Sequence, residues 1–264
     1  MRKLATIWLV LVLVACTTSP SLNNSDDKIE DPGVANVVVA LKGTVNIWGA
    51  VKSLDGTPLG RLAASGVIVA VLDGVSIILT AGHVFQPNTD YTVENSRGEK
   101  HSATFYHVSK THDLGLLWVN RKIGEPAELA VAMPKWGKTV YVVGNKLGGG
   151  IMPTHGIYGG LISSKFARCS APTHPGNSGG GVWTDGELIG IASRIPGVAF
   201  DTNAPGIKSK QLFPTVCMFV PVQAIHAYLQ LTGAKNQITR PDKLEKAVKV
   251  ILPPTPDKWE MEIR

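Results

Sequence analysis

The sequence lacks both the basic runs and the long apolar runs that mark two large classes of protein. No run of Lys or Arg exceeds two residues and none is interleaved with aromatics, although the formal net charge is +6 and the pI is about 9.2. Single-strand binders combine such runs with aromatic side chains. We therefore interpret the charge as an ordinary solvated surface and exclude nucleic acid as a partner. The apolar stretch Leu4 to Val14 has 11 residues, whereas a membrane-spanning helix needs about 20.

Patterns of low complexity and of metal binding are missing too. The 28 glycines have no collagen period, and a hydrophobic share of 44% is too high for a disordered protein. The histidines and cysteines lack zinc-type spacing. Gly148–Gly150 lacks the Gly-Lys-Ser/Thr ending of a phosphate loop. The sequence implies no metal and no cofactor, and its 264 residues suit one sizeable domain or two small ones.

The N-terminus has the pattern of a bacterial export signal. Two basic residues precede the apolar stretch, as in a signal peptide over residues 1–15. The segment LVAC that ends at Cys16 resembles the lipobox of bacterial lipoproteins, which implies that Cys16 is acylated and becomes the new N-terminus. Residues 16–33 would then be a lipidated tether to a membrane, on the periplasmic side of the bacterial envelope. Conventional secretion, with cleavage just after Cys16, remains the alternative.

Short strands separated by turn signals dominate the chain from residue 34 to about 223, which predicts an all-β protein. The strongest signal is a hairpin of Gly66–Leu72 and Val75–Leu79 around an Asp-Gly pair. A β-branched run predicts a strand at Val37–Leu41, and helical spacing predicts a helix at Val222–Thr232. The other expected strands are Thr44–Val51, Tyr91–Asn95, Ser102–Val108, Leu114–Val119, Thr139–Val143, Ile157–Ser163, Phe166–Ala171, Gly181–Trp183, Leu188–Ala192 and Cys217–Val222.

Three motifs together indicate acyl-transfer chemistry. Thr80–Val84 places a histidine directly after a strand, His112–Leu117 places an aspartate at the start of one, and Gly176–Gly180 places a serine in a glycine-rich turn. Acyl transfer needs a nucleophile, a base and a group that fixes the tautomer of the base. It also needs N–H groups aimed at the developing oxyanion. Alone, each motif is more often a loop residue, a strand edge or a turn.

In their chain order the motifs resemble the chymotrypsin-fold serine peptidases, and more narrowly the HtrA/Deg-like branch. The resemblance implies two antiparallel six-stranded β-barrels, at residues 34–123 and 124–232, with a short C-terminal helix and a tail at 233–264. That tail is expected to be too short for the PDZ domain usual in the branch. Ser178 would be the nucleophile, His83 the general base and Asp113 the carboxylate that orients it.

The same resemblance assigns the residues around the triad. The backbone N–H groups of Gly176 and Ser178 would form the oxyanion hole. Pro172 would lie at the base of the primary specificity pocket, where a non-acidic residue makes a preference for Lys or Arg unexpected. A polypeptide substrate would add as a strand beside Ala192, Ser193 and Arg194. Because Arg194 departs from the residues familiar at that position, the resemblance does not predict the shape of the pocket.

Two alternatives to a serine endopeptidase remain: a non-catalytic lipoprotein that uses the fold to bind a partner, and an esterase-type acyl hydrolase. The oligomeric state is not predicted. The resemblance also makes the strands that carry Cys169 and Cys217 neighbours, so these residues form either a disulfide or two buried thiols.

Overall fold

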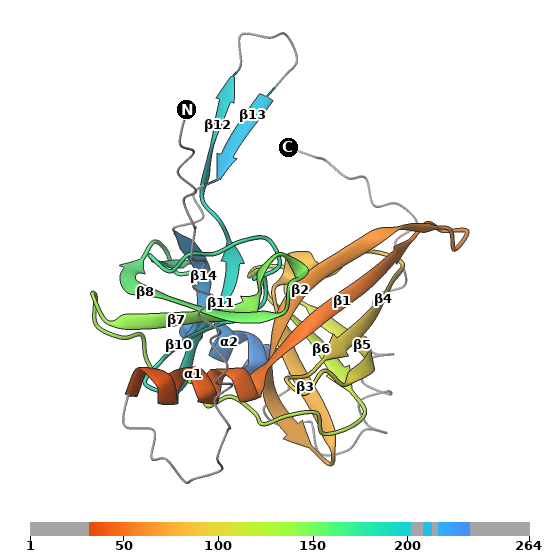
Figure 1. The fold of residues 1–264 in the computed structure, drawn as a ribbon, viewed down its shortest axis with the longest axis horizontal. Helices are drawn as coiled ribbons and strands as arrows, with labels where there is room; N and C mark the ends of the chain where they lie inside the picture. Colours follow the sequence, from red (N-terminus) through yellow and green to blue (C-terminus); the bar gives the residue numbers. More distant parts are fainter. Residues whose placement is uncertain (1–31, 202–207, 213–215, 233–264) are drawn as a thin grey trace, which may run out of the picture.

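Two closed antiparallel barrels of six strands each lie side by side in the computed structural model, which describes residues 32–201, 208–212 and 216–232 (Figure 1). The predicted fold class is confirmed. The first barrel contains β1 (Thr44–Lys52), β2 (Pro58–Leu72), β3 (Val75–Thr80), β4 (Thr89–Glu94), β5 (Lys100–Val108) and β6 (Gly115–Val119). The second contains β7 (Thr139–Asn145), β8 (Ile151–Leu161), β9 (Ala167–Cys169), β10 (Gly181–Thr184), β11 (Glu187–Arg194) and β14 (Cys217–Pro221).

The predicted hairpin joins β2 to β3 through the expected turn. Asp73 and Gly74 have φ of 47° and 82°, and Leu72 pairs with Val75 across the turn. A two-residue turn with both central φ values positive matches the right-handed twist of the strands, which is why Asp-Gly is favoured there. β3 is buried along its whole length and ends next to the first residue of the predicted triad.

The prediction of a strand at Val37–Leu41 is wrong, because this segment lies in helix α1 (Pro32–Gly43). β-branched residues favour strands, but β1 is already paired on one edge with β2 and on the other with β4. The closed first barrel therefore offers no edge to a further strand. Instead α1 packs against β7 and β10 of the second barrel, with Ala40 fully buried (Figure 1).

Three apolar clusters hold the molecule together. One fills the first barrel, around Ile47, and one fills the second, around Phe219. The third lies between the barrels, where Leu116 of β6 and Val220 of β14 belong to one cluster. Helix α2 (Val222–Leu231), at the position predicted from helical spacing, adds its buried face to this third cluster. The seam between the barrels is thus a packed interface, and it fixes the residues on its two sides relative to each other.

A two-stranded sheet was not predicted. It consists of β12 (Gly197–Asp201) and β13 (Lys208–Leu212), and it projects from the second barrel beyond the end of β11 (Figure 1). Two short 3-10 turns complete the elements, η1 (Gly82–Val84) and η2 (Lys146–Gly148). Among the helices in the described ranges, none has the length and apolarity that a membrane crossing requires. The signal peptide, Cys16, most of the tether and the tail at 233–264 lie outside the described residues.

Candidate active site

His83 and Asp113 are held together by the first barrel. His83 lies in η1, directly after β3, and Asp113 lies two residues before β6, the strand that pairs with β3. The backbone N–H of His83 donates to Oδ1 of Asp113 at 2.8 Å. The imidazole Nδ1 lies 2.8 Å from Oδ2 of the same carboxylate. The pairing of β3 with β6 thus fixes both the position of His83 and the orientation of its ring.

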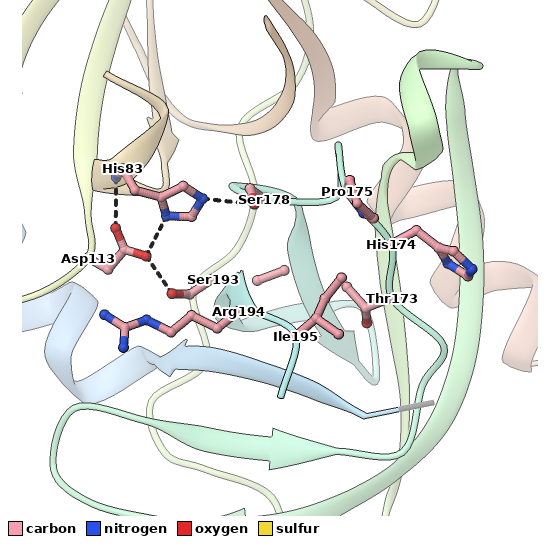
Figure 2. A pocket seen from close by; sticks show the side chains of 10 residues that line it. His83, Asp113, Thr173, His174, Pro175, Ser178, Ser193, Arg194 and Ile195 are labelled. Carbon is pink, nitrogen blue, oxygen red and sulfur yellow. Dashed lines mark hydrogen bonds and ion pairs between the residues drawn. The ribbon is translucent and has the colours of Figure 1, made fainter. Parts of the chain in front are cut away.

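The second barrel brings Ser178 and Ser193 to the same point. Nε2 of His83 lies 2.9 Å from Oγ of Ser178 (Figure 2). Oγ of Ser193, near the end of β11, donates to Oδ2 of Asp113 at 2.5 Å. The structure therefore brings the three predicted triad residues into one hydrogen-bonded chain, and Ser193 extends that chain on the far side of the carboxylate.

Asp113 is a mostly buried carboxylate that remains ionised. Burial alone would raise its pKa, but hydrogen bonds from His83 and Ser193, together with the charge of His83, hold the pKa at about 2. The carboxylate is consequently negative over the whole neutral range. A negative Asp113 accepts a hydrogen bond from the N–H at Nδ1 of His83, which leaves the lone pair of Nε2 facing Ser178.

The loop before Ser178 is bent around Gly176, whose φ is 94°. A Cβ at this position would lie 2.1 Å from the carbonyl oxygen of Asn145, so only glycine fits. The carbonyl of Pro175 accepts the N–H of Leu147 at 2.8 Å, and the carbonyl of Asn177 accepts the N–H of Gly180 at 2.8 Å.

These two carbonyls set the directions of the N–H groups predicted for the oxyanion hole. In a trans peptide the C=O and N–H point in opposite directions, and no described peptide bond is cis. The N–H of Gly176 therefore points away from Leu147, and the N–H of Ser178 points away from Gly180. Both predicted donors are turned away from these backbone partners.

Ser65, which sequence analysis did not single out as a site residue, fastens this loop to the first barrel. Its hydroxyl donates to the carbonyl of Gly176 at 2.8 Å and accepts the N–H of Asn145 at 2.7 Å. Its N–H donates to the carbonyl of Ser178 at 2.8 Å, and its carbonyl accepts the hydroxyl of Thr80 at 2.6 Å. The fully buried Ser65 thus anchors the carbonyls of both predicted oxyanion residues, a contact that no sequence spacing reveals.

An open pocket of about 420 Å³ begins at the triad. Three of the four residues predicted to bind substrate line it: Ala192, Ser193 and Arg194. Figure 2 shows Arg194 beside Ser193 and below Asp113, with Ile195 next to Thr173. The complete lining is His83, Asp113, Thr173, His174, Pro175, Ser178, Ala192, Ser193, Arg194 and Ile195.

Pro172 is not part of this lining, in contrast to the prediction. Its carbonyl accepts the hydroxyl of Thr154 on β8 at 2.8 Å, which ties the residue to the barrel wall. The next two residues, Thr173 and His174, line the pocket in its place. A residue count from Ser178 identifies the segment, but the local bend of the chain decides which of its side chains reach the pocket.

Cys169 and Cys217 are free thiols in this structure, so the possible disulfide is not formed. They are direct partners in the pairing of β9 with β14, and both are buried. A hydrogen bond with Cys169, together with burial, raises the pKa of Cys217. The two thiols therefore pack as small apolar side chains in the second barrel. Nowhere in the described ranges do three His, Cys, Asp or Glu side chains gather into a set that could hold a metal ion.

Comparison with known proteins agrees with the fold and with the type of domain. Residues 64–191 match the family model of the trypsin-like peptidase domain. Among solved structures, the chain is similar to a substituted form of the HtrA-type protease AlgW with a tripeptide, at 21% sequence identity and a TM-score of 0.60. This match covers 75% of the chain and 62% of the AlgW chain. No curated protein matches the sequence. Residues 64–191 are therefore similar to a trypsin-like peptidase domain, and the chain has the fold of the chymotrypsin-like serine peptidases.

Proposed function

We propose that the protein is a serine endopeptidase that hydrolyses polypeptides through an acyl-enzyme. One observation carries the proposal: the hydrogen-bonded chain from Ser178 through His83 to Asp113 opens on a solvent-accessible pocket. A nucleophile, a base and an ionised carboxylate in this order are the components that acyl transfer requires. The family match to a peptidase domain supports the same chemistry.

In the proposed mechanism, Oγ of Ser178 attacks the carbonyl carbon of the scissile peptide bond while Nε2 of His83 takes the hydroxyl proton. Asp113 holds the tautomer and stabilises the imidazolium that forms. The negative oxygen of the tetrahedral intermediate accepts the N–H groups of Gly176 and Ser178. The C–N bond then breaks, and His83 passes its proton to the leaving amine. Water, deprotonated by His83, hydrolyses the acyl-enzyme and regenerates Ser178.

The substrate is proposed to be an extended polypeptide. Along the β10 side of β11, the backbone N–H and C=O of Ala192 are bonded to Gly180 and Gly179. Beyond Ala192, the strands of the described ranges leave this edge unpaired as far as Arg194. An open strand edge next to the nucleophile favours recognition by strand addition, in which backbone hydrogen bonds align the substrate.

A labelling experiment separates this function from a non-catalytic binding role. Ser178→Ala should remain folded but lose turnover by roughly 10⁴- to 10⁶-fold. A fluorophosphonate probe should label wild type on Ser178 and leave the variant unlabelled. Absence of labelling in the wild type would favour the binding role, and retention of activity in Ser178→Ala would exclude the assigned nucleophile.

A substrate comparison separates peptidase from esterase. Wild type should cut a denatured protein and release new N-termini, and Ser178→Ala should not. Rapid turnover of short-chain esters with an intact denatured protein would favour the esterase instead.

We further propose that the protein is attached to a bacterial membrane through a lipid on Cys16. The support is the lipobox-like segment before Cys16. Metabolic labelling with a palmitate analogue should mark wild type and leave Cys16→Ala unmarked. An unmarked wild type, or a marked variant, would contradict lipidation at this residue.

A further inference from the structure

Arg194 is a cationic side chain on the wall of the pocket that the proposed catalysis does not use. It is the last residue of β11 and directly follows Ser193, which contacts the triad carboxylate. Arg194 is exposed, and its guanidinium carbon lies 4.8 Å from the centre of the Phe166 ring. A ring that packs on one face of a guanidinium leaves the N–H donors at its edge free for a ligand.

No carboxylate among the described side chains pairs with this guanidinium. Among the side chains that the structure describes, those of residues 33–196 and 216–232, Arg194 takes part in none of the ion pairs. Asp113 is the one carboxylate that lines the pocket, and its oxygens are taken by His83 and Ser193. The pocket therefore offers an unneutralised cation beside a carboxylate that is fully engaged.

A second cation, Lys146, lies near His174, one of the residues that line the pocket. Burial and the charge of Lys146 together lower the pKa of His174, which lines the pocket. Arg194 in the pocket wall and Lys146 near His174 are thus two cations at or close to the pocket, an arrangement that favours a substrate with negative charge.

The position of Arg194 on β11 determines which residues of a bound substrate its side chain can reach. In a strand added beside β11, side chains alternate between the two faces, so every second residue shares a face. Ser178 and Ser193 both adjoin the triad, so in the proposed antiparallel pairing the attacked residue would lie level with Ser193. The residue before it would then lie level with Arg194, and the residue two positions further toward the N-terminus would share the same face. These are the second and fourth residues of the acyl side, counted from the scissile bond.

We propose that Arg194 forms a subsite for an acidic side chain at the second or fourth residue on the acyl side of the scissile bond. This inference rests on the proposed peptidase function. A guanidinium donates two parallel hydrogen bonds to a carboxylate, whereas an amide side chain of the same shape brings no charge. Glu and Asp should therefore be preferred over Gln and Asn at these two positions, and the preference should weaken as salt screens the pair.

The test compares internally quenched peptides that differ only in Glu against Gln, or Asp against Asn, at one of the two positions. For wild type, kcat/KM should be about 3- to 10-fold higher for the acidic peptide at one or both positions. Arg194→Gln should abolish the difference in kcat/KM. Arg194→Glu should cleave a peptide with Lys at the same position faster than the peptide with Glu. Arg61→Gln serves as the matched control, because Arg61 is an exposed cation on β2 that does not line the pocket.

A binding experiment with inactive protein keeps the inference separate from catalysis. Ser178→Ala should bind a fluorescent acidic peptide more tightly than its amide counterpart, and the double variant with Arg194→Gln should bind both equally. Equal binding by Ser178→Ala, or an acidic preference that survives Arg194→Gln in peptide cleavage, would overturn the subsite. Failure of wild type to cleave any peptide or to react with a fluorophosphonate would instead contradict the proposed peptidase, while the binding arm would still decide the role of Arg194.

Discussion

Asp113 shows how a single side chain balances burial against hydrogen bonding. Burial penalises its negative charge, yet His83 and Ser193 together hold the carboxylate ionised, with a pKa of about 2. Neither donor is adjacent in sequence to Asp113, so the ionisation of this group depends on the folded chain. The charge that orients His83 is therefore a product of tertiary structure and contributes to stability as well as to the proposed chemistry.

Lowering the pH should reveal this contribution as a loss of stability. The folded pKa of Asp113, about 2, lies below its ordinary value of 3.8, so folding favours the ionised form. The stabilisation is complete above pH 3.8 and is lost as the pH falls through 2. It should amount to about 1–2 kcal/mol, a figure reduced for partial solvent screening. Urea unfolding of wild type and Asp113→Asn between pH 6 and 2 should show the two free energies of unfolding converging toward acid.

The difference in unfolding free energy between wild type and Asp113→Asn isolates the contribution of Asp113 to the pH dependence. Asp55 also has a pKa of about 2, because the hydroxyl of Ser53 and the backbone of Thr57 stabilise its charge. Asp55 titrates in wild type and variant alike, so its effect cancels in the difference between them. A difference that stays constant from pH 6 to pH 2 would contradict the assigned pKa of Asp113.

At the scale of elements, the loop that carries Ser178 is held by partners from both barrels. Leu147 in η2 fixes the carbonyl of Pro175, while Ser65 on β2 binds the carbonyls of Gly176 and Ser178. The conformation that aims the N–H groups thus depends on contacts outside the glycine-rich motif. Replacement of such a contact should change catalysis without removing any member of the triad.

Ser65→Ala should lower kcat more than it changes KM. The substitution removes one hydroxyl that binds Gly176 and Asn145, so it should reduce the free energy of unfolding by about 1–3 kcal/mol. Because the loop is then less firmly held, kcat should fall roughly 10-fold, less than the roughly 10²- to 10³-fold lost when an oxyanion donor is removed outright. Steady-state kinetics and the rate of fluorophosphonate labelling measure the effect.

Ser76→Ala is the matched control for Ser65→Ala. Ser76 is equally buried in the first barrel, and its hydroxyl likewise joins two backbone groups, the carbonyl of Arg121 and the N–H of Ile123. It should lose similar stability and keep its kcat. Equal kcat values for the two variants would show that Ser65 has only a structural role.

At the scale of the whole molecule, the two barrels are joined by their apolar seam and by α2. Tyr228 of α2 donates its hydroxyl to the carbonyl of His107 on β5 at 3.0 Å, and the ring Nδ1 of His107 lies 3.0 Å from the same hydroxyl. Burial raises the pKa of Tyr228, so the hydroxyl remains a donor throughout the neutral and alkaline range. A helix that follows the second barrel thus ties the first barrel in place.

Tyr228→Phe tests this tie. Loss of the hydroxyl leaves its half-buried partners on His107 without this hydrogen bond, which should lower the free energy of unfolding by about 1–2 kcal/mol. The residue does not line the pocket, so kcat under native conditions should be unchanged. Urea unfolding and peptide cleavage measure the two quantities. Unchanged stability would show that the hydrogen bond to His107 contributes nothing to the joining of the barrels.

Local signals predicted much of the fold, and long-range contacts account for the rest. The turn at Asp73 and Gly74 follows from the backbone preferences of two residues, and a sequence pattern suffices for it. The helix at Val37–Leu41 does not follow from local preferences, because its β-branched residues favour a strand. The closed first barrel has no free edge for that strand, and the segment is helical.

The same division applies to the site. The three predicted triad residues lie in three local motifs, and the resemblance of these motifs, taken together, to a known family assigned their roles. Ser65 acts through partners about 80 and 110 positions away in the chain, a separation that no local pattern encodes. Thr173 lines the pocket where Pro172 was predicted to do so. Counting residues back from Ser178 does not capture the local bend of the chain that causes this difference.

The proposed triad is divided between the two barrels, so the site can form only after both barrels have been synthesised. His83 and Asp113 belong to the first barrel, while Ser178 and Ser193 belong to the second, more than sixty residues later in the chain. A ribosome therefore completes the base and its carboxylate well before it supplies a nucleophile. Until the second barrel has folded and docked, the proposed proteolytic site is not assembled. The order of synthesis thus delays the proposed activity until almost the whole domain has emerged.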